Sequence, residues 1–275
     1  MSGSPDEFED VRRDPDPIRR GQRAGALLSL YQQRATEMAR LRRAAIEEAH
    51  DQGMTYTEIA TALGITKGRV TQIRNTAPAP ERAFFGVGPV SIGVPLRQGT
   101  DDRMRSYIDA ADVATLEATE ALLNSLSLGV ERFTVSPDTA EPPAGDAVVI
   151  CGPKSAPLGA DLMNRDPVLG MVRENDRWWI TNKQTGERYG SPHNEAPTGS
   201  GDIAYLARHR DDSRVVVHIA GIHSPGSGGV AHYLGRHLGE LHNQVGDKPF
   251  SMAIRCQLDG LTVTGSEVLA GPYIW

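Results

Sequence analysis

Hydrophobic and polar positions follow two different periods along this chain of 275 residues, and the period changes near residue 77. From Pro17 to about Gln52, apolar side chains recur at spacings of three and four, the pattern of an amphipathic helix. This predicts one long helix or two joined helices, and Gly53 is well placed to end it. The stripe either packs on its own domain or pairs with a second copy, and its members are Leu27, Tyr31, Ala35, Met38, Leu41, Ala45 and Ala49.

Beyond residue 88, apolar runs of strand length alternate with helical patterns. Residues 147–152 form a continuous apolar run, as expected for a strand buried on both faces. This alternation predicts an α/β domain with a mixed sheet and some antiparallel edges, Rossmann-like in the broad sense. Strands are expected at 89–96, 131–136, 147–152, 202–210, 213–222, 250–258 and 265–275, a hairpin at 177–191, and helices at 111–126, 156–164 and 229–245.

The segment "GMTYTEIATALGITKGRVTQIRN" (53–75) predicts two short helices joined by a tight turn. Thr55 and Glu58 have the spacing of a capping box at the start of the first helix, and Thr66 can cap the second. A small residue, a turn glycine and three inward aliphatic residues follow at the spacings that a helix-turn-helix requires. These are Ala60, Gly64, Ile65, Val70 and Ile73.

Within this segment, "YTEIATALGITKGRVTQIR" resembles the helix-turn-helix of sigma-factor region 4 and of the regulators that share it. The resemblance implies a transcription regulator that binds double-stranded DNA, with the second helix in the major groove. A helical hairpin used only for protein contacts is the alternative. Side chains suited to phosphates and base edges are Thr66, Lys67, Arg69, Thr71, Gln72 and Arg74 on the second helix, with Arg42 and Arg43 on the helix before it.

Charge is distributed unevenly around this motif. Residues 1–17 carry two basic and six acidic side chains, whereas residues 18–76 carry ten basic and five acidic ones, a net charge of +5 in a chain whose net charge is −6. A basic segment in an acidic chain concentrates attraction for polyanions. We therefore expect a disordered acidic tail at 1–17, a helical DNA-binding domain at 18–76, a linker at 77–88, and an α/β domain for ligand sensing or assembly at 89–275.

Two passages of the second domain resemble one another: "VVICGPKSAPLGADLM" and "VVHIAGIHSPGSGGVAHYL". Each predicts a strand, a glycine-containing turn and a helix, an arrangement whose backbone N–H groups favour an anion such as phosphate. Neither contains GxGxxG or a Walker A sequence, so the ligand and any cofactor stay unknown. The alternative is that glycine serves tight packing. Candidate ligand-binding residues are Gly152, Lys154, Ser155, Gly221, His223, Ser224, Gly226, Ser227 and Gly228.

The loop after the first predicted strand of the sheet, "RQGTDDR", adds Arg97, Asp101, Asp102 and Arg103 as candidates for the same ligand. Strand carboxyl ends line the binding crevice of such sheets. Solvated loop charges are the alternative.

Several classes of protein and site are disfavoured. Cys151 and Cys256 lie far apart, which indicates neither a disulfide framework nor a zinc motif, and we predict no metal site. No apolar run is long enough for a transmembrane helix, and the acidic N-terminus is not a secretory signal, so we expect a cytoplasmic protein. GxSxG, HExxH and paired-carboxylate signatures are absent from the sequence, and no catalytic residue is assigned.

Three hypotheses follow. The first is a one-component regulator, a homodimer whose α/β domain senses a small anionic ligand, a nucleotide being one candidate. The second is a nucleotide- or NAD-processing enzyme with a DNA-binding appendage, for which Asp101, Asp102, Asp146 and Glu267 are the available carboxylates. The third is an interaction module whose α/β domain recruits another protein.

Overall fold

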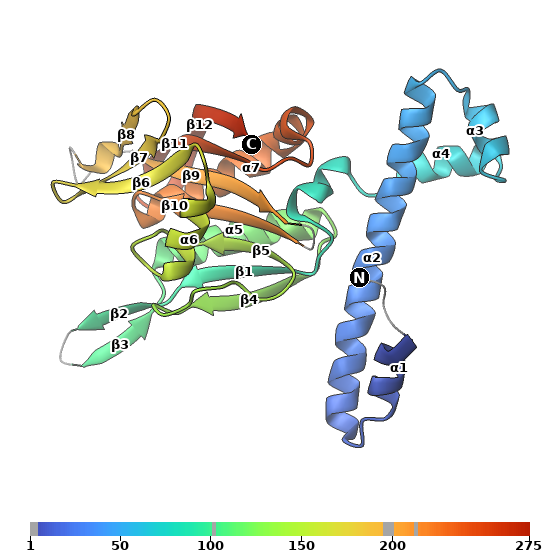
Figure 1. The fold of residues 1–275 in the computed structure, drawn as a ribbon, viewed down its shortest axis with the longest axis horizontal. Coiled ribbons are helices and arrows are strands. Elements are labelled where there is room, and N and C mark those ends of the chain that lie inside the picture. The colour runs from blue at the N-terminus through green and yellow to red at the C-terminus, as the bar shows by residue number, and fades with distance from the viewer. Residues whose placement is uncertain (1–4, 101–102, 195–200, 212–213) are drawn as a thin grey trace. The chain divides into compact units, whose positions relative to one another are not determined.

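The computed structural model describes residues 5–100, 103–194, 201–211 and 214–275 (Figure 1). Asp101 and Asp102, two of the candidate ligand-binding residues, lie outside the described residues. Contacts divide the chain into two compact units. The first comprises the residues up to Ala79 together with Val87–Pro89, and the second comprises Pro80–Gly86 and Val90–Trp275.

The first unit consists of helices. The long amphipathic pattern forms a single helix, which Asp16 caps by accepting a hydrogen bond from the Ile18 amide at 2.9 Å. At 1.5 Å per residue, its 35 residues span about 50 Å. The middle of its apolar stripe, including Ala35, Met38 and Leu41, is exposed. The helices of this unit are α1 (Pro5–Arg12), α2 (Pro17–Asp51), α3 (Tyr56–Ala62) and α4 (Lys67–Thr76).

The acidic N-terminal segment contains helix α1, where the sequence predicted a disordered tail. The ring of Phe8 stacks on Tyr31 of α2 with 5.5 Å between centroids, and the Tyr31 hydroxyl donates to Glu7 at 3.0 Å. The Asp14 carboxylate accepts from Arg19 Nε at 2.7 Å, and this hydrogen bond holds the pKa of Asp14 well below its usual range. The difference arises because the basic start of α2 neutralises a segment that is acidic when considered alone.

The second unit is built on a mixed sheet of seven strands in the order β12-β11-β9-β10-β5-β1-β4. The four strands β10, β5, β1 and β4 are parallel, and β9, β11 and β12 continue the sheet in antiparallel pairs. The chain is therefore a mixed α/β protein with N-terminal helices, as predicted at this level. The strands are β1 (Val90–Pro95), β4 (Val130–Val135), β5 (Asp146–Ile150), β9 (Gly201–Arg210), β10 (Val215–Gly221), β11 (Phe250–Asp259) and β12 (Thr262–Ile274).

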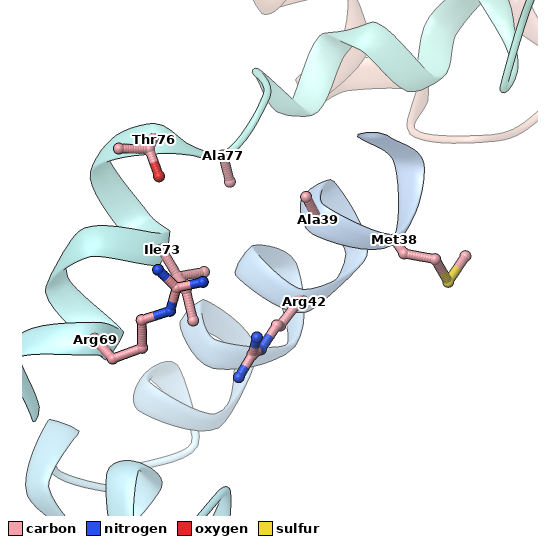
Figure 2. Close-up of a pocket in the computed structure, with 7 residues that line it drawn as sticks. All are labelled: Met38, Ala39, Arg42, Arg69, Ile73, Thr76 and Ala77. Atoms are coloured by element: carbon pink, nitrogen blue, oxygen red, sulfur yellow. The ribbon is translucent and has the colours of Figure 1, made fainter. Parts of the chain in front are cut away.

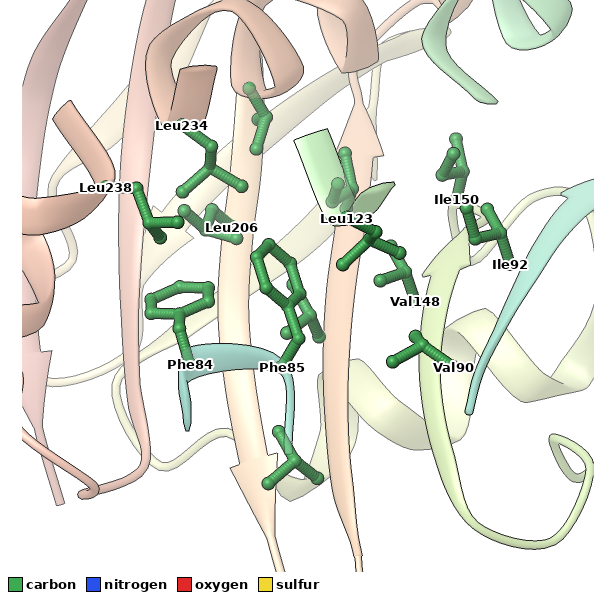
Figure 3. Close-up of a cluster of buried hydrophobic side chains, with 14 of the residues drawn as sticks. Phe84, Phe85, Val90, Ile92, Leu123, Val148, Ile150, Leu206, Leu234 and Leu238 are labelled. Carbon is green, nitrogen blue, oxygen red and sulfur yellow. The ribbon is translucent and has the colours of Figure 1, made fainter. Parts of the chain in front are cut away.

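Side chains alternate between two covered faces of this sheet. Val148 and Ile150 of β5 point into the cluster beneath helices α5 (Ala110–Ser125) and α7 (Ser224–Val245), shown in Figure 3. Val149 between them belongs to the opposite cluster, with Leu158 and Leu162 of α6 (Pro157–Arg165). Burial on both faces explains why the central strands read as unbroken apolar runs.

Two segments expected to be irregular have regular structure. Residues predicted as linker form the 3-10 helix η1 (Pro80–Phe85), because Phe84 and Phe85 are buried in the core of the second unit (Figure 3). The loop predicted after the first strand of the sheet forms part of a hairpin, β2 (Arg97–Thr100) and β3 (Met104–Tyr107). The predicted hairpin at 177–191 gains a third strand: β6 (Leu169–Glu174), β7 (Arg177–Asn182) and β8 (Arg188–Gly190), followed by η2 (Pro192–Asn194).

Candidate nucleic-acid interface and ligand crevice

The turn between α3 and α4 has the local geometry that its sequence predicts. Glu58 completes the capping box with Thr55, and the Thr66 hydroxyl accepts from the Arg69 amide at 3.2 Å. Gly64 has φ +64°, a conformation that residues with a side chain rarely adopt. The packing of α3 and α4 against α2 forms one small core, made of Ile46, Ile59, Ala60, Val70 and Ile73.

The outer face of α4 is polar and exposed. Lys67, Thr71 and Gln72 lie on this face, and Arg69 Nη1 donates to the Gln72 side-chain oxygen at 2.6 Å. The two longest side chains are thus held side by side, with the Gln72 amide group and further guanidinium N–H groups still available as donors. This face can offer hydrogen bonds to a base edge or to phosphates.

Two of the arginines predicted to contact DNA, Arg43 and Arg74, also make contacts within the first unit. The Arg74 guanidinium lies 4.4 Å from the ring centroid of Tyr56, in a cation–π contact, and Arg74 Nε is 3.9 Å from Glu47. Arg43 Nε donates to the same carboxylate at 3.1 Å. Helical periodicity places Arg74 outward, but the aromatic ring and the carboxylate draw its side chain back over the core.

A groove of about 320 Å³ runs between α2 and α4 (Figure 2). Arg42 on α2 and Arg69 on α4 lie on opposite sides of it, with Ile73 between them at its floor (Figure 2). Arg42 is exposed, so two guanidinium groups flank one concave surface. The spacing of charged residues along the chain did not reveal this pairing of Arg42 with Arg69.

In the second unit, a polar crevice lies where the parallel strands β1, β5 and β10 end and α7 begins. Arg97 Nη2 donates to Asp112 Oδ2 at 2.8 Å and to Ser224 Oγ at 2.8 Å. Lys154 Nζ donates to the Ile222 carbonyl at 2.7 Å. Seven of the predicted ligand residues line this crevice: Arg97, Gly152, Lys154, Ser155, Gly221, Ser224 and Ser227.

The charges in the crevice are partly removed from water. Burial raises the pKa of the Asp112 carboxyl, and the hydrogen bond from Arg97 opposes that rise. Burial also lowers the pKa of Lys154, and the nearby positive charge of Arg97 lowers it further. The free space between these side chains, about 10 Å³, is no larger than a single water needs. A ligand would therefore have to displace Asp112 or Ser224 from Arg97.

The glycine-rich passage after β10 is not a loop. Helix α7 begins at Ser224, five residues earlier than predicted, so Gly226, Ser227 and Gly228 lie in its first turns. A Cβ added to Gly226 would lie 2.3 Å from Asp202 Oδ2, and one added to Gly228 would approach Thr115 of α5. These two glycines serve close packing and do not line the crevice.

Asp202 and Asp112 are site residues that sequence reasoning missed. Asp202 is buried at the start of β9, where Oδ2 accepts from the His223 amide at 2.9 Å and Oδ1 lies 3.3 Å from His223 Nδ1. His193 packs on this pair, with 4.8 Å between the two imidazole centroids. Asp202 could have been singled out from the sequence, because it is an acidic residue at the start of an otherwise apolar predicted strand.

Arg103 is exposed at the far end of the β2–β3 hairpin. Arg97 pairs with Tyr107 at the opposite end of the hairpin, and five residues lie between Arg97 and Arg103 along the chain. The segment predicted as a loop is thus a strand pair, which places Arg97 at the crevice and Arg103 at the exposed end of the hairpin.

Three further expectations from the sequence concern the two cysteines, metal sites and membrane-spanning helices. Cys151 and Cys256 are buried free thiols, and burial raises their pKa values to about 12 and about 11. Among the described residues, no cluster of three His, Cys, Asp or Glu side chains is placed to hold a metal ion. Within the same ranges, every helix is too short or too polar to span a lipid bilayer.

Comparison with protein families, with curated proteins and with solved structures finds no match to this chain. Function must therefore be argued from the exposed face of α4 and from the crevice.

Proposed function

We propose that this chain is a one-component transcription regulator. Its first unit binds double-stranded DNA through a helix-turn-helix formed by α3 and α4, and its second, Rossmann-like unit senses a small anionic ligand. The observation that carries this proposal is the exposed polar face of α4, with Lys67, Arg69 and Gln72 presented from a helix whose other face is buried.

The geometry of α4 suits a major groove, which is wide enough to admit an α-helix. Arg69 and Gln72 are hydrogen-bonded neighbours whose remaining N–H groups match the acceptors of guanine or adenine edges. Arg42, across the groove from Arg69, is exposed and well suited to a phosphate. Arg43 contacts Glu47 and Arg74 packs on Tyr56, and these contacts hold α4 against α2 and α3 so that its polar face stays outward.

Ligand sensing in the second unit rests on Arg97. A carboxylate or phosphate entering the crevice would replace Asp112 and Ser224 as the acceptors of the Arg97 guanidinium. Asp112 belongs to α5 and Ser224 to α7, so the exchange would release a link between the two helices. Differential binding of this kind is what allows a ligand to shift a conformational equilibrium.

A homodimer is the oligomeric state that this function favours. Two copies bring two recognition helices to half-sites about one turn of DNA apart, which predicts a palindromic operator. The exposed stripe on α2, with Ala35, Met38 and Leu41, supports a contact between two copies.

Arg69→Ala and Gln72→Ala are expected to weaken operator binding. The operator is first selected from random duplexes with the full chain, and affinities are then measured by fluorescence anisotropy at several salt concentrations. Loss of one good base contact costs about 1–3 kcal/mol, or roughly 5- to 150-fold in affinity. If Arg69 contacts only phosphate, its removal lowers the slope of the salt dependence by about one instead.

Arg173→Ala is the matched control for this experiment, because Arg173 is exposed on the second unit and pairs with the exposed Asp176. It should bind the operator as the wild-type chain does. Wild-type affinity in both α4 variants would refute the assignment of the reading face.

Inorganic phosphate is expected to raise the melting temperature of the full chain, and Arg97→Gln should abolish that shift. A ligand that binds only the folded state at 100 times its Kd stabilises by about 2.7 kcal/mol. Arg188→Gln, which removes an arginine outside the crevice, is the control and should leave the shift intact. A shift that persists in Arg97→Gln would place the anion elsewhere.

The alternative function, a nucleotide- or NAD-processing enzyme with a DNA-binding appendage, is favoured by one observation. Buried Asp202 orients His223, the residue before the crevice-lining Ser224, and a carboxylate–imidazole pair of this kind can act as a general base. Turnover of nucleotides or NAD by the purified chain, lost in Asp202→Asn, would support the enzyme. Its absence would leave the regulator as the better account.

A further inference from the structure

A second concave surface in the second unit is separate from the crevice. It lies between α5, α7 and the turn that joins β11 to β12, and its volume is about 590 Å³. Pockets for small molecules have volumes of about 300–1,000 Å³ and are mostly apolar with a few polar groups. Of the residues that the structure describes, none lines both this groove and the crevice.

The groove exists because both helices carry small residues where they face it. Ala114, Ala118 and Ala121 recur along one side of α5, and Gly235 faces them from α7. A Cβ added to Gly235 would meet no atom within 4 Å, so the space beside it is open. Leu261, in the β11–β12 turn, is 56% exposed and forms the remaining apolar wall.

The ionisable side chains among the described residues that line the groove are His232 and Arg236. Arg236 Nε donates to His232 Nε2 at 3.0 Å, and His232 Nδ1 is 2.7 Å from Ser266 Oγ. With Nε2 as acceptor, His232 is neutral and its other nitrogen donates to the serine hydroxyl. Within the described residues, no carboxylate pairs with Arg236, which leaves its two terminal nitrogens for an acceptor from outside.

The nearest acidic side chain on α7 has another partner. His237 follows Arg236 in the sequence, and its ring nitrogen Nδ1 lies 3.2 Å from the Glu240 carboxylate. Glu240, the acidic residue nearest to Arg236 in the sequence, therefore contacts His237. The groove thus combines an apolar floor with a guanidinium at one end that no carboxylate of the described residues pairs with.

We propose that this groove binds a small amphipathic anion, an acyl or aryl carboxylate, with its apolar body over Ala118, Ala121 and Leu261 and its carboxylate on Arg236. Covering the alanines and Leu261 removes apolar surface from water, which favours binding of the body. A guanidinium can hold a carboxylate through two parallel hydrogen bonds, which selects the head group. This site is independent of the regulator proposed above.

Titration calorimetry of the full chain with decanoate, 1-decanol and acetate tests the proposal. Decanoate should bind in a saturable 1:1 manner, decanol at least tenfold more weakly, and acetate not measurably, because both the apolar body and the anionic head contribute. Arg236→Gln should weaken decanoate at least tenfold and leave decanol unchanged. Arg255→Gln, an exposed arginine on β11 outside the groove, should leave decanoate unchanged.

Ala118→Trp fills the groove from an exposed position on α5 and should abolish binding of decanoate. If this variant does not give the wild-type circular dichroism spectrum, Ala121→Leu takes its place and should weaken binding at least tenfold. Equal affinity for decanoate and decanol, absence of decanoate binding at millimolar concentration, or binding unaffected by filling the groove would each overturn the proposal. A concentration-dependent dimer that Ala118→Trp dissociates would also overturn it, by showing that a second copy covers this face.

Discussion

Acidification from pH 7.5 to pH 5 is expected to lower the free energy of unfolding of the second unit by roughly 4 kcal/mol, about 2 for each of two histidines in its sheet. Burial lowers the pKa of His218 from 6.5 to about 3 and that of His209 from 6.5 to about 4. In the unfolded chain both histidines take up a proton below pH 6.5, whereas in the folded chain they stay neutral at pH 5. Their contribution to stability is therefore complete above pH 6.5 and is lost as the pH falls.

The two histidines lie on adjacent strands on one side of the sheet. His218 of β10 is fully buried, with Nε2 2.7 Å from the Cys151 carbonyl and its ring 5.3 Å from that of Tyr205. His209 of β9 lies 6.3 Å from His218 and 6.1 Å from Trp275, measured between ring centroids. A charge on either ring would be surrounded by aromatic groups in place of water, and this is the physical cause of both shifts.

Urea unfolding at a series of pH values measures the effect as a slope. His209→Gln and His218→Gln should each remove about half of the loss between pH 7.5 and pH 5, whatever they do to the stability at neutral pH. His237→Gln is the control, because the His237 side chain is partly exposed and lies beside Glu240. A double variant that keeps the wild-type slope would contradict the assignment of the proton uptake to these two rings.

Ala60→Leu is expected to destabilise the first unit by about 1–3 kcal/mol or more and to abolish operator binding with it. Ala60 is buried where α3 meets the other helices, and its carbonyl accepts from the Ile65 amide at 3.0 Å in the turn. Three added carbon atoms have no space in a core that consists of Ala60 and four aliphatic residues. A unit of this size has little stability to spare.

Circular dichroism melts and anisotropy with the selected operator measure both consequences. Ala62→Leu is the matched control, because Ala62 lies two residues away on the same helix and is exposed. It should melt and bind as the wild-type chain does. Operator binding at wild-type affinity in Ala60→Leu would show that α3 and α4 do not need their present crossing in order to contact DNA.

The helices α3 and α4 and the turn between them could be predicted from the sequence, because local interactions determine them. Thr55, Glu58 and Thr66 cap α3 and α4 through contacts no more than three residues apart, and Gly64 alone supplies the positive φ of the turn. The strands of the central sheet were also predicted, because burial on both faces requires continuous apolar runs. The first residue of a helix was harder to predict. At α7 the glycines predict a turn, whereas the helix already begins at Ser224, where Pro225 suits a first helical turn.

The sites depended on contacts that no local pattern contains. Arg97 reaches Asp112, 15 positions away, and Ser224, 127 positions away, because the parallel strands bring their carboxyl ends to one edge. Arg74 appears outward by helical period, yet Tyr56 and Glu47 hold it against the core. Periodicity and capping act over a few residues and determine elements, whereas ion pairs and grooves arise between elements, so only the packed structure decides which side chains meet.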